Sequence, residues 1–332
     1  MNSKEKYFKL LQDTKISSYP ETEKVATLKK RLCELSMLRK HALPQYLYRY
    51  RTVDEQGYNI DALIKDEIWG TSANLFNDPL DTQMFFSPIG VKKEYLAFCQ
   101  QVREIEAQLL STPKFLNGLE MSDKDYQLIA NRKRVPSDDA IKGLIENSYS
   151  KILVDIKTQS YIACFTENLY SSLMWAHYAD SHKGFVVEYK AMDLFPDILP
   201  VRYSPERIDA TDLVFYCLAY KLSAEYHIHS GLKDILLPMK ILTNKTMDWK
   251  YEKEWRIFKQ DPPELDFEKE YRGGHQVILK KLPIAVYLGC RIERKHEEIL
   301  CNIAKEKGIP VYKMRYNTTD LISSGLESER IV

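Results

Sequence analysis

The chain has 332 residues, of which 44% are hydrophobic and 29% are charged, a composition typical of globular proteins. The 48 basic residues nearly balance the 47 acidic ones, so the formal net charge of +1 gives no global attraction to nucleic acid or to an anionic membrane. A chain of this length can form one large domain or two smaller ones.

No targeting or redox motif stands out in the sequence. The segment MNSKEKYFKLLQDTK lacks the apolar core and cleavage site of a signal peptide, and no apolar run approaches the roughly 20 residues that a membrane span needs. The six cysteines form no CxxC pair, which indicates buried reduced thiols rather than disulfides or a zinc knuckle. They are Cys33, Cys99, Cys164, Cys217, Cys290 and Cys301. These features predict a cytoplasmic protein.

The sequence predicts an amphipathic helix over residues 20–40. Five apolar residues recur there at helical spacing: Val25, Leu28, Leu32, Leu35 and Leu38. This face could pack onto a core or bind a partner, and periodicity favours packing. We interpret residues 1–42 as an N-terminal helical extension and residues 43–332 as a single α+β domain.

The first predicted strand covers Gln45–Arg51, where tyrosines alternate with leucine and arginine. Arg49 and Arg51 fall on the face opposite the tyrosines. An arginine in a strand can face solvent, but if its face turns inward it can bind phosphate through its planar fork of donors.

A helix is predicted next, with Asn59 or Asp61 as its cap, followed by a short strand with the sequence EIWGTSA. Asn77-Asp78-Pro79 predicts a turn. Residues 91–159 have a mostly helical pattern, and we interpret them as a helical insertion. This insertion contains the local basic cluster NRKR at residues 131–134.

The segment CFTENLYSSLMWAHYADSHKGFVVEY predicts a strand, a helix and a second strand, with Ser171 and Ser172 near the helix N-terminus. Trp175, His177 and Tyr178 follow on that helix. A lone histidine is more often a packing residue than a catalyst, and no histidine pair has a matched carboxylate or cysteine at ligand spacing. No metal site is therefore predicted.

An acid pair occurs in the segment YEKEWRIF, which has the pattern of a strand. On an extended strand Glu252 and Glu254 would point to one face, about 6–7 Å apart. Two carboxylates at this spacing raise each other's pKa, especially where aromatic rings exclude water. They could form a solvated edge paired with Lys253 and Arg256, or they could face one substrate together.

The remaining C-terminal half predicts both helices and strands. Residues 211–247 follow a helical pattern that is interrupted at Pro238. The segments PIAVYLG, RKHEEILCNIAKEKG and IPVYKM then predict a strand, a helix and a strand in a βαβ-like unit.

Several enzyme classes are disfavoured by missing motifs. The sequence contains no GxGxxG after a strand, no GxxxxGK[ST], no HExxH and no GxSxG. Dinucleotide-fold oxidoreductases, P-loop NTPases, zincins and α/β-hydrolases are not expected.

The order of the motifs is specific when it is taken as a whole. LYRYR is followed by IWGTSANLFNDPLD, MWAHYADSHKGFVVEY, WKYEKEWRIF, AVYLG and IPVYKM. This order resembles the bacterial family called domain of unknown function 2971 (DUF2971), over roughly Tyr46 to the C-terminus. The family name implies no activity.

The layout of a strand arginine, a hydroxyl-bearing middle segment and E-x-E is also similar, more distantly, to that of ADP-ribosyltransferases. The resemblance implies an α+β fold with a split mixed β-sandwich whose crevice holds NAD⁺ as a substrate. Arg49 or Arg51 would grip the phosphates of NAD⁺. Ser171 or Ser172 would support the nicotinamide ribose, with Thr71-Ser72 as a rival.

The same resemblance assigns the acids. Glu254 would be the catalytic glutamate that stabilises an oxocarbenium cation, and Glu252 would be the base that activates the acceptor. Trp175 and Tyr178 would lie at the cofactor site, because aromatic rings can stack on nicotinamide or adenine.

The resemblance implies an NAD-dependent ADP-ribosyltransferase, a bacterial toxin or antiphage effector that modifies RNA, DNA or protein and has an antitoxin partner. A non-catalytic module that binds a ligand or partner is the main alternative, and an NAD glycohydrolase is another. A nucleic-acid hydrolase that uses Asp78, Asp81 and Glu188 as metal ligands is less favoured, because these acids are dispersed in the sequence.

Overall fold

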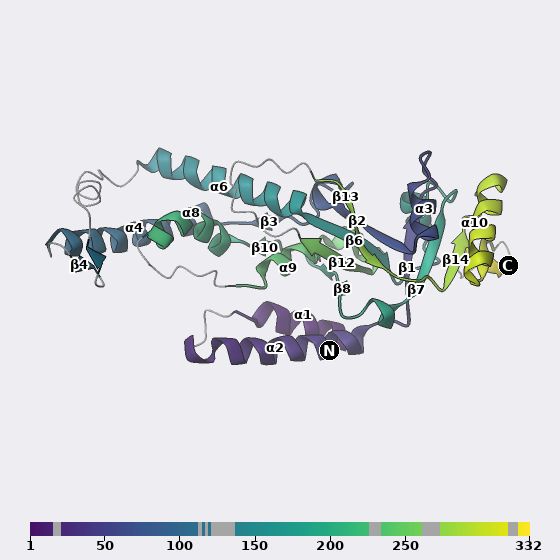
Figure 1. Cartoon of the computed structure of the whole chain (residues 1–332), viewed down its shortest axis with the longest axis horizontal. Helices are drawn as coiled ribbons and strands as arrows, with labels where there is room; N and C mark the ends of the chain where they lie inside the picture. Colours follow the sequence, from purple (N-terminus) through teal and green to yellow (C-terminus); the bar gives the residue numbers. More distant parts are fainter. Residues whose placement is uncertain are drawn as a thin grey trace.

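The computed structural model describes residues 1–15, 21–111, 115–116, 119–120, 137–225, 234–260, 273–317 and 325–332. It is an elongated α+β structure with a sheet at its centre (Figure 1). Helices α4, α6 and α8 extend from one end of the sheet, and α10 lies with the C-terminus at the other. The predicted α+β class is therefore confirmed.

The described helices have the following bounds: α1 (Ser3–Asp13), α2 (Glu21–Ala42), α3 (Tyr58–Ile64), α4 (Pro88–Ser111), α6 (Asp138–Gln159), α7 (Ser172–Tyr178), α8 (Thr211–Glu225), α9 (Leu237–Leu242) and α10 (Arg294–Lys307). Short 3₁₀ helices are η2 (Ala73–Leu75), η3 (Ala191–Leu194) and η4 (Met247–Glu252).

The longer strands are β1 (Tyr46–Arg51), β2 (Glu67–Ser72), β6 (Ser160–Thr166), β7 (Phe185–Lys190), β12 (Glu254–Gln260), β13 (His275–Lys280), β14 (Ala285–Leu288), β15 (Val311–Tyr316) and β16 (Leu326–Arg330). Strands of two residues are β3 (Met84–Phe85), β4 (Phe115–Leu116), β5 (Leu119–Glu120), β8 (Leu199–Pro200), β9 (Arg202–Tyr203), β10 (Ile208–Asp209) and β11 (Asn244–Lys245).

The main sheet is mixed. Its strands follow the order β13-β2-β6-β1-β7-β14-β15-β16, and β12 pairs with both β6 and β8. Strands β14 and β15 are parallel and are joined by α10, which confirms the predicted strand–helix–strand unit at the C-terminus. The other pairs of this sheet are antiparallel.

The sheet divides at β6. Strand β12 runs along the whole of one edge of β6, so β1 and β2 must share the other edge. Strand β1 pairs with β6 only at Tyr48 and Thr166, whereas β2 pairs with it at Ile162 and Tyr161. The two strands therefore leave a gap between them along the middle of β6.

The helices α4, α6, α8 and α9 share one apolar core. Val91, Ile141, Val214 and Ile241 each come from a different one of these helices and are buried together. The described part of the predicted insertion is mainly helical, with the short strands β4 and β5 between α4 and α6, and its helices pack against the later helices α8 and α9. The basic cluster at 131–134 lies outside the described residues.

The predicted N-terminal helix is confirmed as α2, and it packs against α1 through Tyr7, Leu11 and Leu35. Val25 and Leu32 of the same apolar stripe are exposed. Helix α1 also contacts β12, since Lys4 Nζ lies 4.9 Å from the Trp255 ring centroid. One end of the α1–α2 pair is therefore anchored on the sheet.

Three local predictions need correction. The N-cap of helix α3 is Gly57 rather than Asn59 or Asp61, and the Asp54 carboxylate accepts from the N–H groups of Tyr58 and Asn59. Pro238 does not interrupt a helix but lies in the first turn of α9, where its missing N–H costs nothing. Residues 243–246 are not helical: they contain β11, and η4 begins only at Met247.

The cysteines are free thiols: Cys33 is exposed, and the other five are half-buried rather than fully buried as expected. In the ranges that the structure describes, no helix is long and apolar enough to cross a membrane.

The turn between α7 and β7 depends on glycine. Asp180, Ser181 and His182 all have positive φ, and the chain then returns to the sheet at Gly184. A Cβ atom on Gly184 would lie 2.1 Å from the carbonyl oxygen of Arg51, a backbone atom that cannot move aside by itself. Only glycine therefore allows this turn to lie against the end of β1.

We predict that Gly184→Ala lowers the free energy of unfolding by about 2 kcal/mol or more, because the added methyl group overpacks a backbone contact. Gly143→Ala is the matched control, since Gly143 lies in α6 with nothing within 4 Å of the added Cβ. It should stabilise the protein by about 0.5–1 kcal/mol, as expected inside a helix. Urea unfolding of both variants measures the difference, and equal stabilities would refute this account of the turn.

Candidate functional site

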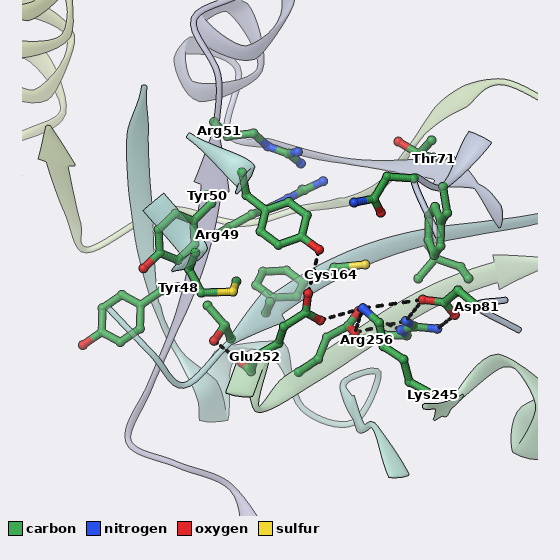
Figure 2. A pocket seen from close by; sticks show the side chains of 18 of the residues that line it. Tyr48, Arg49, Tyr50, Arg51, Thr71, Asp81, Cys164, Lys245, Glu252 and Arg256 are labelled. Atoms are coloured by element: carbon green, nitrogen blue, oxygen red, sulfur yellow. Dashed lines mark hydrogen bonds and ion pairs between the residues drawn. The ribbon is translucent and has the colours of Figure 1, made fainter. Parts of the chain in front are cut away.

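A cavity of about 310 Å³ lies at the gap between β1 and β2 (Figure 2). Arg49 and Arg51 enter it from β1, and a cluster of acidic and basic side chains lies across from them. Aromatic rings of Phe76, Phe165 and Tyr178 complete much of the lining. The cavity thus has a cationic side and a mixed, highly charged side.

Arg256 is fully buried and lies at the centre of the charged cluster. Nη1 and Nη2 donate to the two carboxylate oxygens of Asp81 at 2.9 and 2.6 Å. Nε and Nη2 donate to the two oxygens of Glu254 at 2.7 and 3.0 Å, and Nη1 also donates to the carbonyl of Leu242 at 2.9 Å. These contacts occupy all five N–H donors of the guanidinium.

Lys245 connects the three acids of the cluster. Its Nζ lies 2.6 Å from Glu252 Oε2, 3.1 Å from Glu254 Oε2 and 3.6 Å from Asp81 Oδ2. The ammonium also lies 4.9 Å from the ring centroid of Trp249. Lys245 is buried, so water screens these attractions only weakly.

The local backbone explains how Lys245 reaches the acids. Strand β11 pairs in parallel with β9, which places Lys245 opposite Tyr203. The Tyr203 hydroxyl in turn accepts a hydrogen bond from the N–H of Glu254 at 2.7 Å. Two strands of only two residues each therefore bring the lysine to the start of β12.

The acid pair differs from its predicted geometry. Glu252 is not in the strand but ends η4, and Lys253 adopts a left-handed conformation with φ of 46° before β12 begins at Glu254. The carboxylates therefore converge on one ammonium instead of lying side by side along a strand. Arg256 pairs with Glu254, as the solvated-edge alternative expected, but both glutamates are buried, so the edge is not solvated.

The loop after β6 holds the turn at Lys253. Thr166 Oγ1 donates to the carbonyl of Glu252, and Asn168 Nδ2 donates to the carbonyl of Tyr251. The N–H of Glu167 donates to the carbonyl of Lys253 at 3.3 Å. The last residue of β6 and the two that follow it thereby fix the backbone that carries both glutamates.

The two glutamates are shifted in opposite directions. Burial alone would raise the pKa of Glu254, but Arg256 and Lys245 outweigh it and hold the pKa below its usual range. Burial raises the pKa of Glu252 despite the opposing effect of Lys245, and the charge of Glu254 raises it further. Tyr178 donates to Glu252 Oε1 at 2.6 Å, so both oxygens of this carboxylate have a donor. Glu252 is thus the member of the pair whose carboxylate takes up a proton more readily.

The two arginines are less fully paired than Arg256. Arg49 is buried, donates from Nη2 to the carbonyl of Trp69, and has its guanidinium carbon 5.6 Å from the ring centroid of Phe165. Its buried Nε has no hydrogen-bond partner among the residues described here. Arg51 is half-buried, and burial lowers its pKa to about 10, so it remains protonated at neutral pH. Across the described ranges, neither arginine forms an ion pair with a carboxylate.

The structure brings together five of the eight predicted site residues. Arg49, Arg51, Tyr178, Glu252 and Glu254 all line the cavity. Among the rival hydroxyls, Thr71 also lines it, whereas Ser72 is buried and accepts a hydrogen bond from the N–H of Gly274.

Ser171, Ser172 and Trp175 do not line the cavity. Ser171 is the N-cap of α7 and accepts from the N–H of Met174, and Ser172 is exposed. Trp175 is fully buried and donates from its indole N–H to the carbonyl of Leu169, which is a packing role.

Sequence reasoning missed Lys245 and the pairing of Asp81 with Arg256. Lys245 lies in a segment that was predicted to be helical, and no pattern marks a two-residue strand. Asp81 follows the predicted turn at Asn77-Asp78-Pro79, which is supported by a hydrogen bond from the N–H of Leu80 to Asp78 at 2.8 Å. The buried, bidentate pairing of Asp81 could not be seen without the fold.

The alternative set of metal ligands is not brought together as a metal site. Asp81 pairs with Arg256, and Glu188 accepts a hydrogen bond from the hydroxyl of Tyr287 at 3.1 Å. The described part of the chain contains no group of three or more His, Cys, Asp or Glu residues that could hold a metal ion.

We predict that Arg256→Met lowers the free energy of unfolding by about 3–5 kcal/mol, because it leaves two buried carboxylates with too few donors. Arg294→Met is the control, since Arg294 forms an exposed ion pair with Glu298 on α10 and should be nearly neutral. Denaturant unfolding at pH 7 compares the two variants. If Arg256→Met were as stable as Arg294→Met, the cluster would not support the fold.

Comparison with known proteins gives one match. Residues 174–257 match the model of a family described as "Protein of unknown function (DUF2971)". Searches of curated proteins and of solved structures gave no match. The matched range includes Tyr178, Lys245, Glu252, Glu254 and Arg256. This match supports the predicted DUF2971 family, and none of the comparisons supports the more distant resemblance to ADP-ribosyltransferases.

Proposed function

We propose that the cavity binds NAD⁺ and that the protein transfers its ADP-ribosyl group to an acceptor. The observation that carries this proposal is the position of two arginines without carboxylate partners, in the ranges described, across one cavity from a carboxylate that can exchange a proton. The two arginines can bind a phosphate, and the carboxylate can accept the proton that the acceptor loses during ribosyl transfer.

Charge balance supports an anionic ligand. The cluster of Asp81, Glu252, Glu254, Lys245 and Arg256 contains three acids and two bases. Its net charge is −1 when Glu252 is ionised and zero when Glu252 is protonated. Two protonated arginines on the opposite side then give the cavity a net positive charge, which a phosphate would offset.

The gap in the sheet is compatible with the split β-sandwich expected for such an enzyme. Strands β1 and β2 separate along β6, and the arginine-bearing strand forms one side of the opening. The cavity volume of about 310 Å³ is at the lower end of small-molecule sites, which span roughly 300–1,000 Å³. We propose that it encloses the nicotinamide ribose and adjacent phosphate, with the adenosine at the opening.

The proposed reaction uses the two glutamates differently. The bond between the nicotinamide nitrogen and the ribose breaks, its electron pair stays with nicotinamide, and an oxocarbenium cation forms on the ribose. Glu254 remains ionised and contributes fixed negative charge close to this cation. The acceptor then supplies the electron pair of the new bond, and its proton passes to Glu252.

A second candidate is a non-catalytic module that binds a nucleotide or another phosphate. The observation that favours it is the engagement of Glu254, whose two oxygens both accept from Arg256. Because Arg256 holds both oxygens, the Glu254 carboxylate cannot change its position during a reaction. The module would share the arginine site but would not cleave NAD⁺.

We predict that Glu252→Gln lowers the rate of nicotinamide release from NAD⁺ at least about 100-fold, within the range for loss of an acid–base group. Glu254→Gln should lower it similarly, but by removing charge rather than a proton acceptor. The activity of the wild type should rise with pH through the raised pKa of Glu252, because only the ionised carboxylate can accept a proton. Chromatographic assay of nicotinamide between pH 5 and 9 measures all three effects.

The outcomes separate the candidate functions. Binding of NAD⁺ without nicotinamide release would favour the non-catalytic module. Release without transfer to any acceptor would indicate an NAD glycohydrolase. Full activity of Glu252→Gln, with its fold confirmed by circular dichroism, would contradict the proposed mechanism.

A further inference from the structure

Lys245 is the cation that the two glutamates share, whereas Arg256 pairs with Glu254. Glu254 has two cationic partners, because Arg256 contacts both of its oxygens and Lys245 contacts one. Glu252 has one cationic partner among the described residues, which is Lys245 at 2.6 Å. Loss of Lys245 would therefore leave Glu254 paired and Glu252 without a counter-charge.

The other groups that face Glu252 do not replace this cation. Tyr178 of α7 donates a hydrogen bond but carries no charge, since burial keeps its pKa above the ordinary value. Tyr203 of β9, Tyr251 of η4 and Glu254 of β12 also interact with Glu252. Arg256 of β12, Cys164 of β6 and Asp81 line the same cavity. Of these, Arg256 is fully used by Asp81, Glu254 and a carbonyl.

The geometry points to Lys245 as a positioning residue that ties both glutamates to one ammonium and supplies the counter-charge that stabilises Glu252 in its ionised form. The inference rests on the proposed function for its catalytic consequence, but the electrostatic arrangement can be measured without turnover. A lysine suits this position, because a compact ammonium with three donors can face three carboxylates at once.

The consequence for the reaction follows from the proton balance. Lys245 stays protonated throughout, since the surrounding carboxylates raise its pKa even though burial would lower it. The acceptor's proton moves to Glu252, whose charge falls from −1 to zero, while the charges on Lys245 and Glu254 do not change. Lys245 therefore sets the pH at which Glu252 is available as a base and does not itself exchange the proton.

The test is a carboxylate titration by NMR of protein labelled with ¹³C at the glutamate side chains. The Glu252 resonance is assigned by its loss in Glu252→Gln. Lys245→Met should raise the pKa of Glu252 by about one pH unit or more, because it removes the nearest opposite charge. Lys250→Met is the matched control: Lys250 is exposed on the neighbouring η4, and its removal should leave the titration unchanged.

A wild-type measurement covers the case in which Lys245→Met does not fold. The ¹⁵Nζ resonance of Lys245 should shift at the pH at which Glu252 titrates, and this shift should disappear in Glu252→Gln. An unchanged Glu252 titration in folded Lys245→Met would overturn the inference. A Lys245 ¹⁵Nζ resonance that does not shift at the pH at which Glu252 titrates would overturn it as well.

The same variants separate this inference from the proposed function. If both hold, the acid limb of nicotinamide release moves to higher pH in Lys245→Met by the same amount as the NMR titration. If the wild type releases no nicotinamide at all, the proposed function fails, and the NMR titration still decides the role of Lys245.

Discussion

The pairing of Arg256 with Asp81 and Glu254 is the constraint on which the candidate site depends. A guanidinium without solvent exposure is stable only if its donors are satisfied, and here every donor has an acceptor. Asp81 lies 175 residues from Arg256 in the sequence, and these contacts hold it in the lining of the cavity. The start of β12 is held by the same contacts, so the position of Glu254 follows from this one buried side chain, whereas Glu252 is held by Lys245 and Tyr178.

The sheet provides the space that this cluster faces. Strands β1 and β2 diverge along one edge of β6, while β12 covers the other edge without interruption. Arg49 and Arg51 then line the opening from β1 (Figure 2), and Arg49 also contacts Trp69 of β2 and Phe165 of β6. An uninterrupted sheet would leave no cavity here, because β1 would pair along β6 past Thr166.

Much of the fold could be predicted because the elements are long and periodic. The alternation of tyrosine and arginine identified β1, and the apolar runs identified β6 and β7. The helix α2 and the C-terminal strand–helix–strand unit also follow from spacing alone. Contacts between neighbouring residues of one segment could also be predicted, and the pairing of Glu254 with Arg256 is an example.

The rest of the site could not be predicted, because it depends on short elements and distant contacts. Lys245 reaches the acids through two strands of two residues, and these carry no periodic signal. The left-handed Lys253 turns Glu252 out of the strand, although lysine gives no sequence cue for that conformation. Ser171 and Trp175 follow motifs that suggested a binding site, but they cap a helix and fill the core.

We propose that a phosphate of NAD⁺ binds between the β1 arginines and the charged cluster. Calorimetric titration of NAD⁺ into the wild type and Arg51→Ala tests this most directly, with Arg294→Ala as the exposed control on α10. Because Arg49 is already engaged with the carbonyl of Trp69, the account predicts that Arg51→Ala weakens binding at least about tenfold, as expected for loss of a charge-assisted hydrogen bond. Arg294→Ala should bind as the wild type does. Equal affinity in all three proteins, or no binding of NAD⁺ to the wild type, would contradict the account.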